Sequence, residues 1–349
     1  MNAKKLLALL LALCLVLTFA VGCGGSSEPA ADGGDQEASG DPEQTIMVAY
    51  FMAVDHPVDK SMNLFKEYVE ENSDSLKIEL YPNSQLGSED VYIDSCVQGT
   101  VQMGISGTMC AKYHPAIYAQ ETPYLFSTWE EAKTYLNGDY GNMLYDGFEA
   151  DSGLVYLGSI VNGFREFSCN FEIKDMDSFK GIRMRVPNVP NYVEMVEALG
   201  GSPIAMSLTD LFTALEQKSV DGQDNPYPTD LLQSFYEVQG YALESHHMFS
   251  PQNIFMNADF YNNTLTDAQR EVIQAGLQQA IDHNWDISED YDGEAKQQLI
   301  DNGMQITEPS EEFLAQMQAA MEPVYEWYYS EIAGSEDYIK TVLQAEGRA

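Results

Sequence analysis

Basic side chains are scarce in this sequence. Its 349 residues include 17 lysines and arginines against 55 aspartates and glutamates, which gives a formal net charge of −38 at pH 7. Proteins that bind nucleic acid or an anionic membrane surface need clustered positive charge, so this balance argues against both kinds of partner. The charge is typical of a solvated acidic surface that keeps an exported protein soluble. Any arginine in an apolar context therefore needs an explanation.

Cysteine is also scarce. Of five cysteines, Cys14 and Cys23 lie in the N-terminal segment, which leaves Cys96, Cys110 and Cys169 in the rest of the chain. An odd number of cysteines indicates no framework of structural disulfides.

Signatures of catalysis are missing as well. The chain has no Gly-x-Ser-x-Gly, no His-Glu-x-x-His, no glycine-rich phosphate loop and no Ser-x-x-Lys. The nearest calcium pattern, residues 288–293, fails because Leu299 stands where the loop needs a glutamate. His246 and His247 are adjacent on a predicted strand, so they point to opposite faces and cannot chelate one metal. The sequence predicts no enzyme, no metal and no cofactor.

Long apolar runs are missing except at the N-terminus. Lys4 and Lys5 precede an apolar run over residues 6–20, which is followed by Gly22 and Cys23. A basic start, a run too short to span a bilayer and small residues before a cut site are typical of a secretory signal. The Gly-Cys ending resembles a bacterial lipoprotein signal, in which the cysteine is lipidated. We expect a lipoprotein signal peptide at 1–22 and lipid attachment at Cys23; an ordinary secreted protein with a chance cysteine is the alternative.

The next segment has no large apolar side chain. Residues 24–44 are Gly, Ser, Ala, Pro, Asp, Glu and Gln. Such a segment cannot bury enough surface to offset its ordering entropy. We therefore expect residues 23–44 to form the lipid anchor and a flexible acidic tether. The remaining body of about 305 residues is long for a single core and suits two lobes.

Strand and helix patterns alternate along this body, and this order predicts an α/β fold with a parallel sheet. Predicted strands cover residues 45–52, 76–81, 101–105, 153–160 and 183–186. Predicted helices begin at Val58, Ser88, Pro190 and Ser207, and another runs from Thr266 to about Ile300, with a break near Trp285 left open. Capping boxes are expected at Ser207 and Thr266. The apolar stripe from Phe313 to Tyr325 is expected to be one face of a further helix.

The most informative stretch is residues 180–187 (KGIRMRVP), followed by residues 220–226 (VDGQDNP). It places Arg183 and Arg185 on a short strand that stops at a proline. The fork of donors on a guanidinium is the natural partner of a carboxylate. The later stretch is expected to form a tight polar turn, in which Asn225 is held extended by the following proline.

These marks belong to a wider resemblance. From about Ile46 to the C-terminus the chain resembles the extracytoplasmic solute receptors of tripartite ATP-independent periplasmic (TRAP) transporters, of the four-carbon-dicarboxylate and sialic-acid type. The resemblance is carried by His56-Pro57 and by residues 81–87 (YPNSQLG), 162–165 (NGFR), 180–187, 215–226 and 235–239 (FYEVQ). Each mark alone is weak, but six in the family's order across nearly the whole chain are specific.

The resemblance implies a two-lobed fold of the periplasmic-binding-protein type (type II). Mixed sheets flanked by helices would be joined by hinge strands and by a long helix that spans both lobes. Residues 45–162 with about 251–285 would form lobe I, and residues 163–250 with about 286–349 would form lobe II. The ligand would be enclosed between them.

The resemblance also implies ligand-binding residues in lobe II. Arg185 matches the family arginine that forms a two-pronged salt bridge with the ligand carboxylate, Arg165 matches a second arginine near the same anion, and Asn225 matches an asparagine that hydrogen-bonds the ligand. The alternatives are that either arginine pairs with an acid on a lobe surface and that Asn225 is only a turn former. Arg183, at a position usually occupied by lysine, is expected on the surface, although a period of two would place it on the same face as Arg185.

In lobe I the family pattern is thinner. Sialic-acid-binding relatives place polar contacts where this chain has Phe51 and Gly107, which argues against sialic acid and favours a smaller acid or one with an apolar face. Phe51, Ser106 and Thr108 are the expected pocket residues. Glu89 is expected to face the cleft and to accept a hydrogen bond from a hydroxyl or an amine.

The sequence therefore predicts a receptor that binds a small organic acid and delivers it to the membrane subunits of a TRAP permease. It would be extracytoplasmic and held at the membrane by its N-terminal lipid. A sensory protein with the same pocket and a carbohydrate-acid-processing enzyme are the alternatives.

Overall fold

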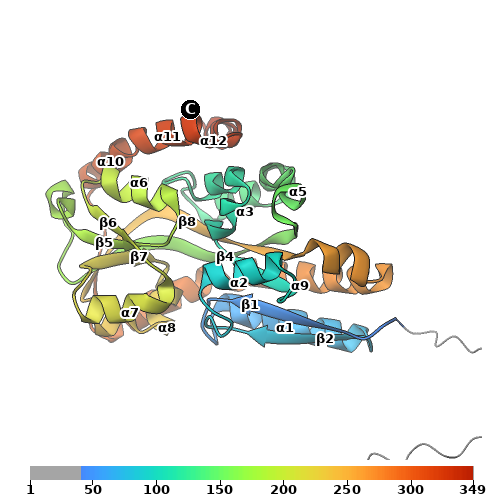
Figure 1. Cartoon of the computed structure of the whole chain (residues 1–349). Helices are drawn as coiled ribbons and strands as arrows, with labels where there is room; N and C mark the ends of the chain where they lie inside the picture. The colour runs from blue at the N-terminus through green and yellow to red at the C-terminus, as the bar shows by residue number, and fades with distance from the viewer. Residues whose placement is uncertain (1–40, 349) are drawn as a thin grey trace, which may run out of the picture. The chain divides into compact units, whose positions relative to one another are not determined.

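Two long strands, β4 (Leu154–Cys169) and β8 (Tyr241–Asn257), pair antiparallel at the centre of the fold. The computed structural model describes residues 41–348. One nine-stranded sheet extends to both sides of this pair, in the order β2-β1-β3-β8-β4-β7-β5-β6, and β9 also pairs with β8 (Figure 1). The other strands are β1 (Gln44–Tyr50), β2 (Leu76–Tyr81), β3 (Met103–Ser106), β5 (Arg183–Val186), β6 (Ser202–Ala205), β7 (Gly222–Asn225) and β9 (Gln305–Thr307).

Each side of the sheet is parallel within itself. In the first half, which we define as β1, β2 and β3 with the helices between them, β1 pairs parallel with β2 and β3. In the second half, which we define as β5, β6 and β7 with α6, α7 and α8, β5 pairs parallel with β6 and β7. The predicted parallel sheet is thus correct within each half, but β8 runs antiparallel to β3 and β4 runs antiparallel to β7. The α/β fold with a mixed sheet is confirmed.

Twelve α-helices cover the described part of the sheet. They are α1 (Pro57–Asn72), α2 (Glu89–Val97), α3 (Trp129–Leu136), α4 (Gly138–Asn142), α5 (Phe148–Ser152), α6 (Pro190–Ala198), α7 (Leu208–Glu216), α8 (Tyr227–Leu232), α9 (Asp267–Asp301), α10 (Glu311–Ala320), α11 (Glu322–Glu331) and α12 (Ser335–Ala345). Two 3₁₀ segments, Thr108–Lys112 and Pro115–Glu121, follow β3 directly. Between them they carry three side chains of the cavity described below.

Helix α9 is 35 residues long and contacts elements of both halves. It packs on α1 in the first half, on β4 and on α8 in the second half. The predicted capping box is confirmed, since Gln269 N donates to Thr266 Oγ1 at 3.2 Å and Thr266 N donates to Gln269 Oε1 at 3.1 Å. The helix continues without a break through Trp285, and the buried Asn284 amide fixes it to β4 by accepting from Val161 N at 2.7 Å.

The C-terminal helices lie beside α6 of the second half and beside α3 (Figure 1). Helix α11 contacts α6, and α12 contacts the 3₁₀ segment Pro115–Glu121. Tyrosine hydroxyls attach them to main-chain carbonyls, as where Tyr325 donates to Pro123 at 2.8 Å and Tyr338 to Tyr135 at 3.1 Å. The lobe boundaries expected from the resemblance stay a prediction.

Two local predictions are wrong. The stripe from Phe313 to Tyr325 is not one helix, because α10 ends at Ala320 and α11 begins at Glu322, with a proline in its first turn. Ser207 does precede α7, but its hydroxyl donates to the Asp210 carboxylate at 2.8 Å instead of capping the main chain. The Ser207 hydroxyl is therefore oriented toward the Asp210 side chain and accepts no hydrogen bond from the first turn of α7.

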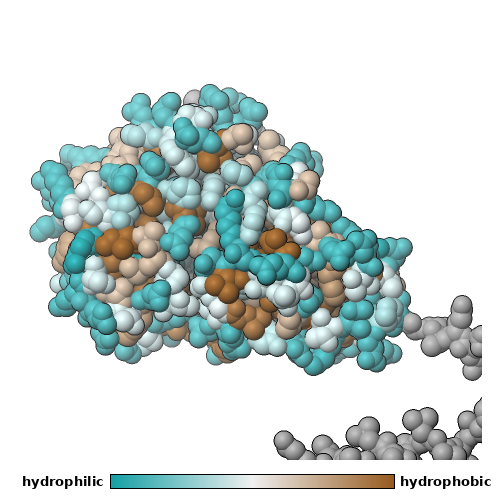
Figure 2. All heavy atoms as spheres, in the orientation of Figure 1, coloured by the Kyte–Doolittle hydropathy of each residue, from teal (hydrophilic) through white to brown (hydrophobic). Residues whose placement is uncertain are grey.

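The face drawn in Figure 2 is largely hydrophilic, with apolar residues in small separate spots. Cys96, Cys110 and Cys169 are buried and free. Along residues 41–348 no helix is both long and apolar enough to cross a membrane. The predicted signal peptide, Cys23 and most of the predicted tether lie outside the described residues.

At Gly222 the main chain of the neighbouring strand leaves no room for a side chain. A Cβ atom at this position would lie 2.5 Å from the Ser168 carbonyl oxygen and 3.2 Å from Met184 Sδ, on the two strands that flank β7. We expect Gly222→Ala to lower the free energy of unfolding by about 1–3 kcal/mol, because the main chain has to shift. Gly240→Ala is the matched control, since nothing lies within 4 Å of a Cβ there. Equilibrium urea unfolding measures both, and equal stabilities would contradict the prediction.

Candidate functional site

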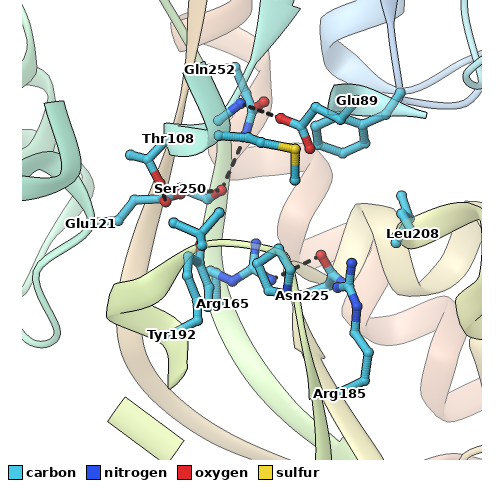
Figure 3. Close-up of a pocket in the computed structure, with 15 residues that line it drawn as sticks. Glu89, Thr108, Glu121, Arg165, Arg185, Tyr192, Leu208, Asn225, Ser250 and Gln252 are labelled. Carbon is cyan, nitrogen blue, oxygen red and sulfur yellow. Dashed lines mark hydrogen bonds between the residues drawn. The ribbon is translucent and has the colours of Figure 1, made fainter. Parts of the chain in front are cut away.

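A cavity lies between the two halves, beside β4 and β8 (Figure 3). It is narrow, with a volume of about 40 Å³, well below the roughly 300–1,000 Å³ usual for small-molecule sites. Its lining comes from both halves and from the two central strands. The residues are Phe51, Glu89, Gly107, Thr108, Met109, Glu121, Arg165, Arg185, Pro187, Val189, Tyr192, Leu208, Asn225, Ser250 and Gln252.

Six of the seven predicted site residues line this cavity, namely Phe51, Glu89, Thr108, Arg165, Arg185 and Asn225. The seventh, Ser106, is buried behind the lining, and its hydroxyl donates to Glu89 Oε1 at 2.7 Å. The structure thus brings together residues from 51 to 225 that are far apart in the sequence. Their role in ligand binding stays a prediction at this point.

The YPNSQLG stretch positions the first-half residues. Asn83 and Ser84 have positive φ angles, and their amides donate to the carbonyls of Met52 and Tyr50 at 2.8 and 3.1 Å. The turn therefore closes against the end of β1, where Phe51 lies, and leads into α2, whose first residue is Glu89. A compact left-handed turn of this kind requires residues that tolerate positive φ, which Asn and Gly do best.

Arg185 is a buried cation with no acidic partner in the described chain. Only 3% of the residue is exposed, and its Nε and Nη2 donate to the Met206 carbonyl at 3.1 and 2.9 Å. Among residues 41–348 no carboxylate lies within 4 Å of its guanidinium. Burial lowers its pKa to about 10. A buried charge normally requires pairing, so the site is suited to an anion that enters from outside.

Arg183 lies two residues earlier at the exposed start of β5. Its Nη2 is 2.6 Å from Asp221 Oδ1, and 44% of its side chain is exposed. The prediction that Arg183 is a surface residue is correct. Arg183 and Arg185 can lie on the same face of β5 and still differ in exposure. The cavity is lined by Arg185 and does not reach back to Arg183 at the start of the strand.

Arg165, in contrast, has an internal counter-ion. Its Nε lies 2.7 Å from Asp224 Oδ2, and its Nη2 donates to Asn225 Oδ1 at 3.2 Å. The Tyr192 ring stacks on it, with its centroid 4.9 Å from Cζ. Its partner is a buried acid, so the alternative of a pairing on a lobe surface is wrong for Arg165, while its contact with a ligand stays a prediction. It orients the Asn225 amide beside the cavity.

Asp224 holds this arrangement together. It is fully buried, and His247 Nε2 lies 3.3 Å from the same Oδ2 that accepts from Arg165. Burial alone would raise the pKa of Asp224, but Arg165 and His247 hold it well below its usual range. The carboxylate is therefore ionised throughout the physiological pH range and neutralises Arg165.

Residues 222–225 form a buried strand, β7, and not the predicted polar turn. Asn225 pairs in register with Glu166 of β4, and its side-chain amide donates to Gln223 Oε1. Pairing on both edges outweighs the turn preference of Asp, Gly and Asn. The alternative that Asn225 only forms a turn is therefore wrong, because it lies in a strand.

Two carboxyl groups lie at the end of the cavity away from Arg185. Glu121 is buried and was not predicted, and Glu89 lies nearby (Figure 3). Burial raises the pKa of both groups, that of Glu89 to about 7. Tyr192, Ser250 and Gln252 were also missed. Ser250 and Gln252 follow the two histidines on β8, and the period of two along that strand was the only signal for them.

We expect Asp224→Asn to lower the free energy of unfolding by about 3–5 kcal/mol, because it leaves the Arg165 guanidinium buried without its counter-ion. Asp221→Asn is the matched control, since it removes the same charge from the exposed pair with Arg183 and is expected to have a much smaller effect. Urea unfolding at pH 7 compares the two variants. Equal losses would show that the burial of the Arg165–Asp224 pair does not matter.

Comparison with known proteins identifies the family of this chain. Residues 48–332 match the family model described as bacterial extracellular solute-binding protein, family 7. The sialic acid-binding periplasmic protein SiaP of Vibrio cholerae is 27% identical over 275 residues, which cover 78% of this chain and 84% of that protein.

Solved structures agree. A TRAP periplasmic solute binding protein of Haemophilus influenzae with bound L-gulonate superposes with a TM-score of 0.83 at 31% identity, over 86% of this chain and 99% of that one. The sugar acid binding protein DctPAm of Advenella mimigardefordensis, in complex with galactonate, gives a TM-score of 0.84 at 28% identity, over 88% and 100% of the two chains. The chain therefore belongs to family 7 of the bacterial extracellular solute-binding proteins, the extracytoplasmic receptors of TRAP transporters, which bind solutes and are not enzymes.

Proposed function

We propose that this receptor binds a small organic acid in the cavity, with the ligand carboxylate on Arg185, and delivers it to the membrane subunits of a TRAP permease. The observation that carries the proposal is the buried Arg185 guanidinium, which has no acidic partner among residues 41–348. Related receptors have been solved with L-gulonate, galactonate and succinate, all of which are carboxylates.

The geometry supports different roles for the two arginines. Arg185 donates from Nε and Nη2 to one carbonyl, and its remaining N–H groups can donate to a ligand. Arg165 is neutralised by Asp224 and contributes mainly by orienting Asn225, whose amide lies beside the same cavity. A hydrogen bond to a charged group is worth roughly 1.5–3 kcal/mol, so two or three of them with some apolar burial can give micromolar affinity, about −8 kcal/mol.

Binding would close the two lobes around the ligand by a hinge motion. The proposed lobes are residues 45–162 with about 251–285 and residues 163–250 with about 286–349. Two features near the boundary at residues 162–163 support a hinge there. Strand β4 shifts register against β8 between Val161 and Gly163 and again between Arg165 and Phe167, and Gly163 has a φ of +120°. Register shifts of this kind bend strands locally.

We further propose that the receptor is held at the membrane by a lipid on Cys23, with the residues between Cys23 and β1 as a flexible tether. The predicted tether is one residue too long, because Gln44 is the first residue of β1. The proposal rests on the Lys4-Lys5 start, the apolar run and the Gly22-Cys23 ending. A tether of about 20 residues composed of small polar side chains reaches roughly 25 Å on average, since its end-to-end distance grows as 5–6 Å times the square root of its length. That reach keeps the receptor near the permease.

We expect Arg185→Lys to weaken carboxylate binding at least tenfold, because an ammonium cannot reproduce the two-pronged geometry of the guanidinium. Arg183→Lys makes the same exchange two residues away at an exposed pair and is expected to leave the affinity unchanged. A thermal-shift screen against dicarboxylates, uronates, aldonates and keto acids supplies the ligand, and calorimetry then measures both variants. If Arg185→Lys binds as tightly as the unaltered protein, Arg185 is not the carboxylate anchor.

We expect Cys23→Ala to abolish incorporation of labelled palmitate and to release the protein from the membrane fraction. Cys14→Ala is the control, because it removes a thiol from the same N-terminal segment and should leave labelling intact. Continued labelling of Cys23→Ala would rule out this residue as the attachment site.

A further inference from the structure

The cavity has two chemically different ends. Arg185, Arg165 and Asn225 come together at one end, and Glu89 and Glu121 lie at the other (Figure 3). If the ligand carboxylate occupies the arginine end, then the rest of the ligand faces two carboxyl groups. The two carboxyl groups of the protein therefore influence which chemical groups the far end of the ligand can carry.

Both carboxyl groups converge on Gly107 and are held by neutral donors. Glu89 Oε1 accepts from Ser106 Oγ at 2.7 Å and from the Gly107 amide at 3.0 Å. Glu121 accepts from the Thr108 hydroxyl through Oε2 and from Ser250 Oγ at 3.3 Å through Oε1. A Cβ at Gly107 would lie 3.7 Å from Glu121 Oε1, so the two side chains flank the same glycine. In the part of the chain described, neither glutamate forms an ion pair.

A third acceptor points to the same end. The side-chain oxygen of Gln252 is buried and has no hydrogen-bond partner among the described residues, while its Nε2 donates to Ser250 Oγ at 3.2 Å. A buried acceptor without a donor costs free energy unless a ligand supplies one. Glu89, Glu121 and Gln252 thus form an acceptor cluster at the far end of the cavity.

The charges that act on the two carboxyl groups are limited. Those facing Glu89 are Glu121 and Arg185, those facing Glu121 are Arg165 and Tyr192, and Tyr92 and Cys110 lie close by. Burial raises the pKa of Glu89 to about 7 and that of Glu121 above its usual range, so both are weaker acids than an exposed glutamate. Groups of this kind accept hydrogen bonds from hydroxyls without requiring a cation, and they repel a second anion.

We propose that Glu121 and Glu89, with Gln252, select a monocarboxylate whose far end carries hydroxyl groups, and that they reject dicarboxylates. The inference rests on the proposed function, since it assumes that the ligand carboxylate lies on Arg185. Glu121 is the main specificity-determining residue because both of its oxygens are fixed within the cavity lining. The ligand class is that of polyhydroxy acids.

Matched pairs of ligands test the proposal. Galactonate and galactarate, and likewise gluconate and glucarate, differ only in a terminal alcohol or carboxylate. Calorimetry is done at pH 7.5 on the chain from residue 24. In each pair that binds, the ligand with the terminal alcohol should bind at least tenfold more tightly than the ligand with two carboxylates.

Two further measurements assign the effect to the acidic end. Glu121→Gln and Glu89→Gln should each reduce the preference for the alcohol several-fold, and Glu289→Gln, on the exposed side of α9, should leave it unchanged. In the unaltered protein the preference should also shrink between pH 7.5 and 5.5, because protonated carboxyl groups no longer repel the second carboxylate. This pH arm keeps the test informative if a variant fails to fold.

Two outcomes would overturn the inference. They are a dicarboxylate that binds as tightly as its matched alcohol, and a failure of all the aldonates to bind. In each case the proposed function stands if another organic acid binds and Arg185→Lys weakens it. A complete lack of binding by organic acids defeats both, and so does an Arg185→Lys variant that binds as tightly as the unaltered protein.

Discussion

The antiparallel pairing of β4 with β8 is the constraint on which the rest of this receptor depends. These strands are the only path through which the described sheet connects the first half to the second. Because neighbouring strands must lie about 4.8 Å apart, the pairing fixes the distance between residues that face the cavity from both strands. Arg165 on β4 and Ser250 and Gln252 on β8 are placed in this way. The site is therefore built on the central strand pair and completed by residues from each half.

Two motifs of the family meet at this pair. His56 begins α1 by accepting from the Val58 amide at 3.1 Å, and its Nε2 lies 2.9 Å from Asn162 Oδ1 on β4. Burial lowers the pKa of His56 to about 4, so the ring stays neutral and bridges the helix and the strand by hydrogen bonds alone. The first half is thereby attached to the central strand a few residues before Arg165.

Much of this could be predicted from the sequence, and the failures have physical causes. The α9 capping box was predicted because capping is a local signal. Guanidinium chemistry pointed to both Arg183 and Arg185, and only the resemblance to the family singled out Arg185. Glu121 was missed because a further carboxylate in so acidic a chain carries no information until burial is known. The strand at 222–225 was missed because its residues prefer turns, and only pairing with β4 and β5 decides otherwise. Strand β4 was predicted to end at residue 160, whereas it continues to Cys169 through the register shifts beside Gly163.

The three cysteines of the described body carry a practical consequence. Cys96, Cys110 and Cys169 are buried, and burial raises the pKa of each thiol. The thiolate is the reactive form, so these side chains react slowly with maleimides and similar reagents at neutral pH. A cysteine introduced on the surface of each half would then be the preferred point of attachment for a fluorophore. The distance between the halves can accordingly be followed in solution by energy transfer, without first removing the native thiols.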